Sequence, residues 1–204
     1  MAPIKMLVTD FENNSRKGEQ IIFEGINSGK TYSMVTGVDG IFRMELPGGE
    51  TYLIKIKSIG DAQEYTKFKI PLLGEDEIYT EYQLLLKFEL PKLFVLDNVH
   101  FDTGKAMLKK ESYTELNELV ELMKLKEKLK VEIAGHTDNV GDNDSNLTLS
   151  QARADAVRNY VIKKGISGER IIAKGYGENF PVDTNDTPQG KQKNRRTEVR
   201  IVQQ

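Results

Sequence analysis

Three residues with the chemistry to form a site stand together in the segment AGHTDNVGDNDSNLTLSQARA, residues 134–154. His136 and Asp138 are separated by one residue, and Arg153 follows a polar loop and falls inside a helical pattern. A second His-x-Asp pair, His100 and Asp102, ends an earlier strand-like run. Such residues can ligate a metal ion, act as an acid–base pair, or bind the charges of a ligand. The three kinds of site predict different functions.

A metal site is the first hypothesis. Residues i and i+2 of a strand share a face, so two neighbouring strand ends would bring two imidazoles and two carboxylates together as ligands for zinc or iron. Short spacings of this kind arise easily by chance, and no third histidine or HExxH helix supports them. A calcium loop beginning at Asp142 fails, because Leu147 and Arg153 stand where that loop requires glycine and glutamate.

Nucleophilic catalysis has little support in the sequence. Thr137 is adjacent to His136, so their side chains diverge on a strand, and no GxSxG elbow occurs. Gly175, Tyr176 and Gly177 lack the third glycine and the following helix of a dinucleotide-binding fingerprint. The expected structure at these glycines is a tight turn after a strand.

A charged binding site for a ligand is the third hypothesis. Thr148 and Gln151 form a capping relation that predicts where the helix begins. The predicted buried stripe of this helix consists of Leu149, Ala152, Ala156 and Tyr160. Arg153 then lies at the edge of that stripe, in the first turns of the helix. Facing Asp138, its guanidinium can hold an external carboxylate by bidentate hydrogen bonds, with a favourable contribution from the helix dipole.

The composition is that of a soluble globular chain of 204 residues, with a net charge of -2 and no cysteine. It excludes disulfides, thiol nucleophiles and cysteine-based zinc sites. The basic cluster in residues 187–202 lacks interleaved aromatic side chains, so we predict no nucleic-acid binding. No apolar run approaches the length of a membrane span.

Hydrophobic periodicity divides the chain into two parts. From Gln20 to Phe88 apolar residues alternate with polar ones, and Asp-Gly and Pro-Gly-Gly turns separate the runs. We expect an antiparallel β-domain over residues 1–90. After about residue 90, helical periodicity appears between short strand-like runs. This change in hydrophobic pattern predicts a second domain over residues 91–204.

The second domain is predicted to have the order β-α-β-α-β-β. The expected strands are 94–101, 130–137, 169–177 and 196–202, and the expected helices are 112–129 and 147–165. In the first helix, a capping box formed by Ser112 and Glu115 precedes an apolar stripe of Leu116, Leu119, Val120 and Met123. The alternation of strands and helices favours parallel pairing, with helices packed on one sheet.

Three ordered blocks from about Phe94 to Val202 carry a family resemblance. They are VHFDTGKAML, then VEIAGHTDNVGDNDSNLTLSQARADAVRNYVIKKGI, then RIIAKGYGENFPVDTNDTPQGKQKNRRTEVRI. These blocks resemble the OmpA-like C-terminal domain, which binds peptidoglycan in outer-membrane proteins, peptidoglycan-associated lipoproteins and flagellar stator proteins. Residues 18–70, with TGVDGIFRMELPGGETYLIKI, resemble a carboxypeptidase regulatory-like, transthyretin-like β-sandwich. The implied fold class is α+β: an antiparallel sandwich followed by an OmpA-like domain with helices on a mixed sheet.

The resemblance implies a binding site for the diaminopimelate of the peptidoglycan stem peptide. Asp138 would accept from its ammonium group, and Arg153 would clamp its carboxylate. The remaining implied site residues are Thr137, Asn146, Leu149, Phe101, Asp102, Thr103, Asn194 and Arg195. Strand alternation alone leaves open whether Arg195 or Arg196 faces the pocket. His136 would be structural, and neither a metal nor a cofactor is implied.

We therefore expect a noncatalytic, periplasmic protein that ties an outer-membrane or periplasmic assembly to the cell wall. The sandwich would contact an envelope protein partner, and a leader and an anchor would lie outside this sequence. Two alternatives remain open. One is a metal-dependent hydrolase of wall peptides using His100, Asp102, His136 and Asp138; the other is an interaction module that has lost wall binding.

Overall fold

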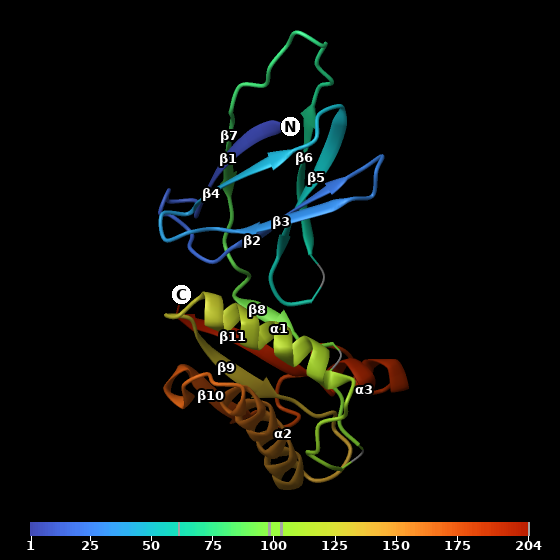
Figure 1. Cartoon of the computed structure of the whole chain (residues 1–204). Helices are drawn as coiled ribbons and strands as arrows, with labels where there is room; N and C mark the ends of the chain where they lie inside the picture. The colour runs from blue at the N-terminus through green and yellow to red at the C-terminus, as the bar shows by residue number, and fades with distance from the viewer. Residues whose placement is uncertain (61, 98, 103, 204) are drawn as a thin grey trace. The chain divides into compact units, whose positions relative to one another are not determined.

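The computed structural model describes residues 1–60, 62–97, 99–102 and 104–203. The chain forms two compact units, Met1–Leu90 and Pro91–Gln204. Figure 1 shows strands alone in the first unit and both helices and strands in the second. In the described part of the chain, no helix combines the length and the hydropathy needed to cross a membrane.

Two β-sheets make up the first unit. Its strands are β1 (Ala2–Thr9), β2 (Gln20–Gly25), β3 (Thr31–Val35), β4 (Ile41–Leu46), β5 (Glu50–Lys57), β6 (Gln63–Ile70) and β7 (Tyr82–Lys87). One sheet has the order β4-β1-β7 and the other the order β3-β2-β5-β6. All neighbouring strands are antiparallel except β1 and β7, which are parallel. The predicted antiparallel sandwich thus has one parallel pair.

Alternation along the strands produces the core of this unit. Phe23 on β2 contacts Phe42 on β4 edge-on at a centroid distance of 6.3 Å, which joins the two sheets. Strand β1 lies before the region in which alternation was predicted. Its alternate residues Ala2, Ile4, Met6 and Val8 are at most 1% exposed. They place a central strand of the smaller sheet at the very start of the sequence.

The second unit contains three helices and a four-stranded mixed sheet (Figure 1). Its elements are β8 (Leu93–Val95), α1 (Ser112–Leu125), β9 (Lys130–Gly135), α2 (Asn143–Lys163), a 3-10 turn (Gly168–Arg170), β10 (Ile171–Gly175), α3 (Pro188–Asn194) and β11 (Thr197–Gln203). The sheet order is β10-β9-β11-β8. Among the described neighbouring strands of this sheet, β9 and β10 form the parallel pair; β11 inserts between β9 and β8 and runs antiparallel to both, so β8 and β9 have the same direction without pairing. The expected mixed sheet is confirmed, and parallel pairing is found between β9 and β10, whereas β8 and β9 are separated by β11.

The first predicted helix and strand need two corrections. All four predicted stripe residues of α1 are buried, at 2% exposure or less. The capping box is wrong, because α1 has no side-chain cap and the buried Ser112 hydroxyl accepts from the backbone N–H of His100 at 3.0 Å. The first strand is Leu93–Val95 rather than 94–101, and Phe101 forms only an isolated bridge with Leu108.

Helix α2 begins earlier and faces the sheet differently than predicted. Asp142 is its N-cap, accepting from the N–H of Ser145 at 2.9 Å, so Thr148 does not start the helix. Its buried residues are Asn146, Ser150, Arg153, Ala154, Val157 and Val161. Small side chains on this face meet Gly135 and Gly175 at the ends of β9 and β10, where the helix backbone approaches the sheet closely. Backbone proximity, rather than a broad apolar stripe, sets the orientation of α2.

Replacing Gly135 with alanine should destabilise the second unit by about 1–3 kcal/mol. The added Cβ would lie 2.3 Å from the backbone oxygen of Ser150, so α2 would have to move away from β9. Chemical denaturation measures the loss. Gly168→Ala is the control, because its Cβ would meet only the ends of the flexible Arg158 and Ile162 side chains. Equal stability of the two variants would contradict the close packing.

Candidate functional site

A pocket of about 560 Å³ opens in the second unit. It lies where the segment after β8, the loop after β9, the start of α2 and the end of α3 meet. The lining residues are Val99, His100, Phe101, Gly104, Thr137, Asp138, Val140, Asn146, Leu149, Arg153, Gln192 and Arg195. Seven of the ten residues expected in the site therefore border one cavity.

Asp138 provides the carboxylate of the pocket. It lies three residues after the end of β9 and is 6% exposed. Its Oδ1 accepts from the backbone N–H of Val140 at 3.1 Å, and its Oδ2 forms an ion pair with the guanidinium of Arg195. Each oxygen of Asp138 thus already accepts one contact from within the protein.

Arg153 reaches the same pocket from α2 but is buried rather than at the edge of an apolar stripe. Its Nε donates to the carbonyl of Lys105 at 3.1 Å, and its Nη2 lies 3.5 Å from that of Asp102. The guanidinium also lies 5.1 Å from the centroid of the Phe101 ring. Burial, and then the nearby charge of Arg195, lower the pKa of Arg153 from its ordinary value. Arg153 thus ties the loop after β8 to α2.

Arg195, not Arg196, lines the pocket. Arg195 is the C-cap of α3, where its guanidinium pairs with Asp138 and also donates to Gln192. Arg196 points into the protein and pairs with Glu198 at 2.6 Å. The structure therefore settles the choice that strand alternation left open.

Two of the expected site residues, Asp102 and Asn194, are described by the structure and do not line the pocket. Asp102 pairs with Lys109 at 3.2 Å and with Lys105 at 3.6 Å. Asn194 is fully buried, and its side-chain oxygen accepts from the N–H of Val182 at 2.8 Å. Asn194 therefore fixes the segment before α3 rather than meeting a ligand. Thr103 lies outside the described residues.

Several lining residues were absent from the expected site. They are Val99, His100, Gly104, Val140 and Gln192. Gln192 precedes Arg195 by three residues, which on a helix places the two side chains on one face. That spacing was the available signal for Gln192. The other four belong to loops around the pocket, and no local periodicity marks them.

The two histidines have different surroundings. His136 is 1% exposed and stacks on the ring of Tyr176 at a centroid distance of 5.3 Å. His100 is exposed and borders the pocket. Within residues 1–60, 62–97, 99–102 and 104–203, no group of three or more histidine, aspartate or glutamate side chains is arranged to hold a metal ion. His136 is thus a core residue beneath the site.

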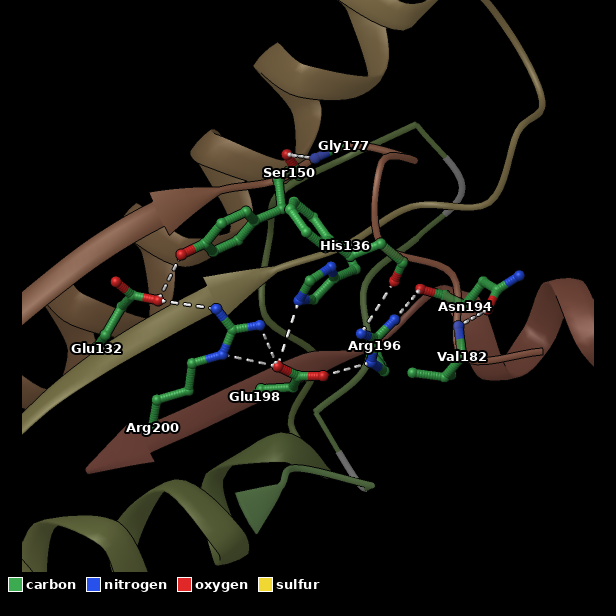
Figure 2. Close-up of polar contacts among 11 residues, drawn as sticks. Glu132, His136, Ser150, Gly177, Val182, Asn194, Arg196, Glu198 and Arg200 are labelled. Atoms are coloured by element: carbon green, nitrogen blue, oxygen red, sulfur yellow. Dashed lines mark hydrogen bonds and ion pairs between the residues drawn. The ribbon is translucent and has the colours of Figure 1, made fainter. Parts of the chain in front are cut away.

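A buried charged cluster surrounds His136 (Figure 2). Glu198, 3% exposed, pairs with Arg196 at 2.6 Å and with Arg200 at 2.7 Å. Arg200 also contacts Glu132, which accepts from the Tyr176 hydroxyl at 2.9 Å. Burial alone would raise the pKa of Glu198, but hydrogen bonds from the two arginines outweigh it and the pKa is lowered. The cluster holds the start of β11, which begins two residues after Arg195.

His136 should make stability depend on pH. Burial, and then the charge of Arg196, lower its pKa to about 4, so the folded protein holds it neutral while the unfolded chain protonates it below about 6.5. Its contribution is complete above pH 6.5 and falls as the pH drops toward 4, by about 3 kcal/mol. Denaturation from pH 7 to 4.5 should show this slope. His136→Phe should flatten it, and the same slope in that variant would contradict the assignment; the exposed His100→Gln serves as control.

Comparisons with known proteins find similarity over the part of the chain that holds the pocket. Residues 100–195 match the model of the OmpA family. The chain is 41% identical over 107 residues to outer membrane porin F of Pseudomonas fluorescens, covering 52% of this chain and 33% of that protein. It is 36% identical over 101 residues to the peptidoglycan-binding protein ArfA of Mycobacterium bovis, covering 50% and 31%.

Among solved structures, the peptidoglycan-associated lipoprotein from Burkholderia pseudomallei is 26% identical with a TM-score of 0.47, covering 52% of this chain and 88% of that one. The chain spans between 13% and 48% of the length of the first curated relatives that it matches. The likeness therefore concerns a domain and not the whole of those relatives.

Proposed function

Because residues 100–195 are an OmpA family domain, we propose that this chain binds peptidoglycan without catalysis, through the diaminopimelate of the stem peptide. One relative is named as a peptidoglycan-binding protein and another as an outer membrane porin. We extend the same role to this chain, with a periplasmic location at the outer membrane or cell wall. The first unit would then dock an envelope partner that the second unit ties to the wall.

The observation that carries this proposal is the shared pocket of Asp138 and Arg153. Diaminopimelate carries an ammonium and a carboxylate on one carbon at the end of its side chain. A buried carboxylate suits the ammonium group, and a guanidinium held in place by backbone carbonyls suits the carboxylate. The half-buried Leu149 and the buried Thr137, which both line the pocket, offer contact for the aliphatic part.

The expected affinity for a single stem peptide is modest. A charge-assisted hydrogen bond contributes roughly 1.5–3 kcal/mol, so a few of them give about millimolar to micromolar dissociation constants. Peptidoglycan is a polymer that presents many stem peptides. A second attachment of the protein to the envelope would therefore raise the avidity without any new contact.

A pull-down with diaminopimelate-containing sacculi tests the proposal. Wild type should sediment with the sacculi, and folded Asp138→Ala and Arg153→Ala variants should remain in solution. Asp144→Ala is the control, since Asp144 is exposed in the first turn of α2 and does not line the pocket. Failure of wild type to bind, or equal binding by all variants, would refute the assignment.

A further inference from the structure

In the pocket, the guanidinium of Arg195 pairs with the carboxylate of Asp138, which a ligand ammonium group would need. Both oxygens of Asp138 are engaged, one by the N–H of Val140 and the other by the guanidinium of Arg195. The Asp138 side chain is only 9% exposed. An incoming ammonium group therefore competes with the guanidinium of Arg195 for a carboxylate that has little exposed surface.

Arg195 is the more easily displaced of the two arginines in the pocket. Its side chain is 39% exposed, and besides Asp138 it donates to the side-chain oxygen of Gln192 on the surface helix α3. Arg153, by contrast, is 8% exposed and bonded to the carbonyl of Lys105. A ligand can thus move the Arg195 side chain outward, whereas moving Arg153 would break contacts to the pocket wall.

Displacing Arg195 has an electrostatic consequence that depends on the ligand. Among the described lining residues, two guanidiniums face the single carboxylate of Asp138. An ammonium that takes Asp138 alone would leave both arginines without a carboxylate in a partly buried space, which is unfavourable. A ligand that also carries a carboxylate gives the displaced guanidinium a new partner.

We propose that Arg195 is a specificity-determining residue, an internal competitor for Asp138 that only a ligand with both an ammonium and a carboxylate displaces efficiently. This inference rests on the proposed function and goes beyond it. It states that the pocket selects zwitterionic amino-acid ends over simple amines, and that selection arises from exchange of the Asp138–Arg195 ion pair.

Calorimetric titration of the full chain with two soluble stem peptides tests this exchange. One peptide carries diaminopimelate, and the other carries lysine, which keeps the ammonium but lacks the second carboxylate. Wild type should prefer the first peptide by roughly ten- to hundredfold. Arg195→Gln should bind the lysine peptide better than wild type does, so that the preference falls to about threefold or less.

Lys191→Gln provides the matched control, because it removes one positive charge from α3 at a residue that does not line the pocket. It should keep the wild-type preference. If Arg195→Gln keeps that preference too, or if wild type binds both peptides equally, the exchange is refuted while the proposed function stands. If wild type binds neither peptide and no sacculi, the proposed function itself fails.

Discussion

Replacing Arg153 with lysine is expected to weaken binding of a diaminopimelate stem peptide roughly tenfold or more, although the positive charge is kept. The guanidinium donates to the carbonyl of Lys105, approaches that of Asp102, and still has N–H groups that can meet a ligand carboxylate. A lysine ammonium is a compact charge without this planar fork. A lysine at this position cannot hold the loop after β8 and bind the ligand carboxylate at the same time.

Arg158→Lys is the matched control for this variant. Arg158 lies on the same helix and donates to the carbonyls of Ile171 and Gly168, away from the pocket. Both variants should lose some stability, but only Arg153→Lys should lose affinity in calorimetry. It should also speed hydrogen exchange in residues 101–108. Equal affinity of the two variants would show that Arg153 does not contact the ligand.

Local patterns predicted the elements whose contacts are also local. The buried stripe of α1 was predicted correctly, because residues spaced three and four apart share one face of a helix whichever element packs against it. Strand β1 was missed although Ala2, Ile4, Met6 and Val8 alternate clearly. Its partners β4 and β7 follow about 40 and 80 residues later, so no neighbouring turn signals a hairpin.

The errors in α2 have a non-local cause. The helix presents Ser150 and Ala154 to the sheet because Gly135 and Gly175 let the backbones approach. Larger apolar residues such as Leu149 suggested a different stripe, and only knowledge of the glycine positions across the interface would have corrected it. Because the buried face of α2 differs from the predicted one, Arg153 is a buried residue at the pocket and does not lie at the edge of an apolar stripe.

The choice between Arg195 and Arg196 illustrates a second limit. Alternation distinguishes neighbouring side chains only within a strand, and β11 begins at Thr197. Both arginines precede it, where the C-terminus of α3 directs Arg195 to Asp138 and the buried Glu198 attracts Arg196. The family resemblance led us to expect seven of the residues that line the pocket, and the end of α3 determines which of the two arginines lines it.

The buried charges beneath the pocket lead to the largest stability effect that we expect. Glu198→Ala should destabilise the second unit by about 3–5 kcal/mol, because it leaves the buried Arg196 without its carboxylate partner. Glu121→Ala, which removes an exposed carboxylate paired with Lys124, should change stability by less than about 1 kcal/mol. Denaturation of both variants measures the difference.

Loss of Glu198 should also weaken binding at the pocket, because Arg196 connects the cluster to the segment that carries Arg195. The guanidinium of Arg196 donates to the carbonyl of Phe180 at 3.2 Å, and the backbone carbonyl of Arg196 accepts from the N–H of His136, two residues before Asp138. Glu198→Gln keeps the shape but not the charge, so it should fall between wild type and Glu198→Ala in both stability and sacculi binding. If a folded Glu198→Ala variant binds sacculi as wild type does, the cluster supports the fold without positioning the pocket.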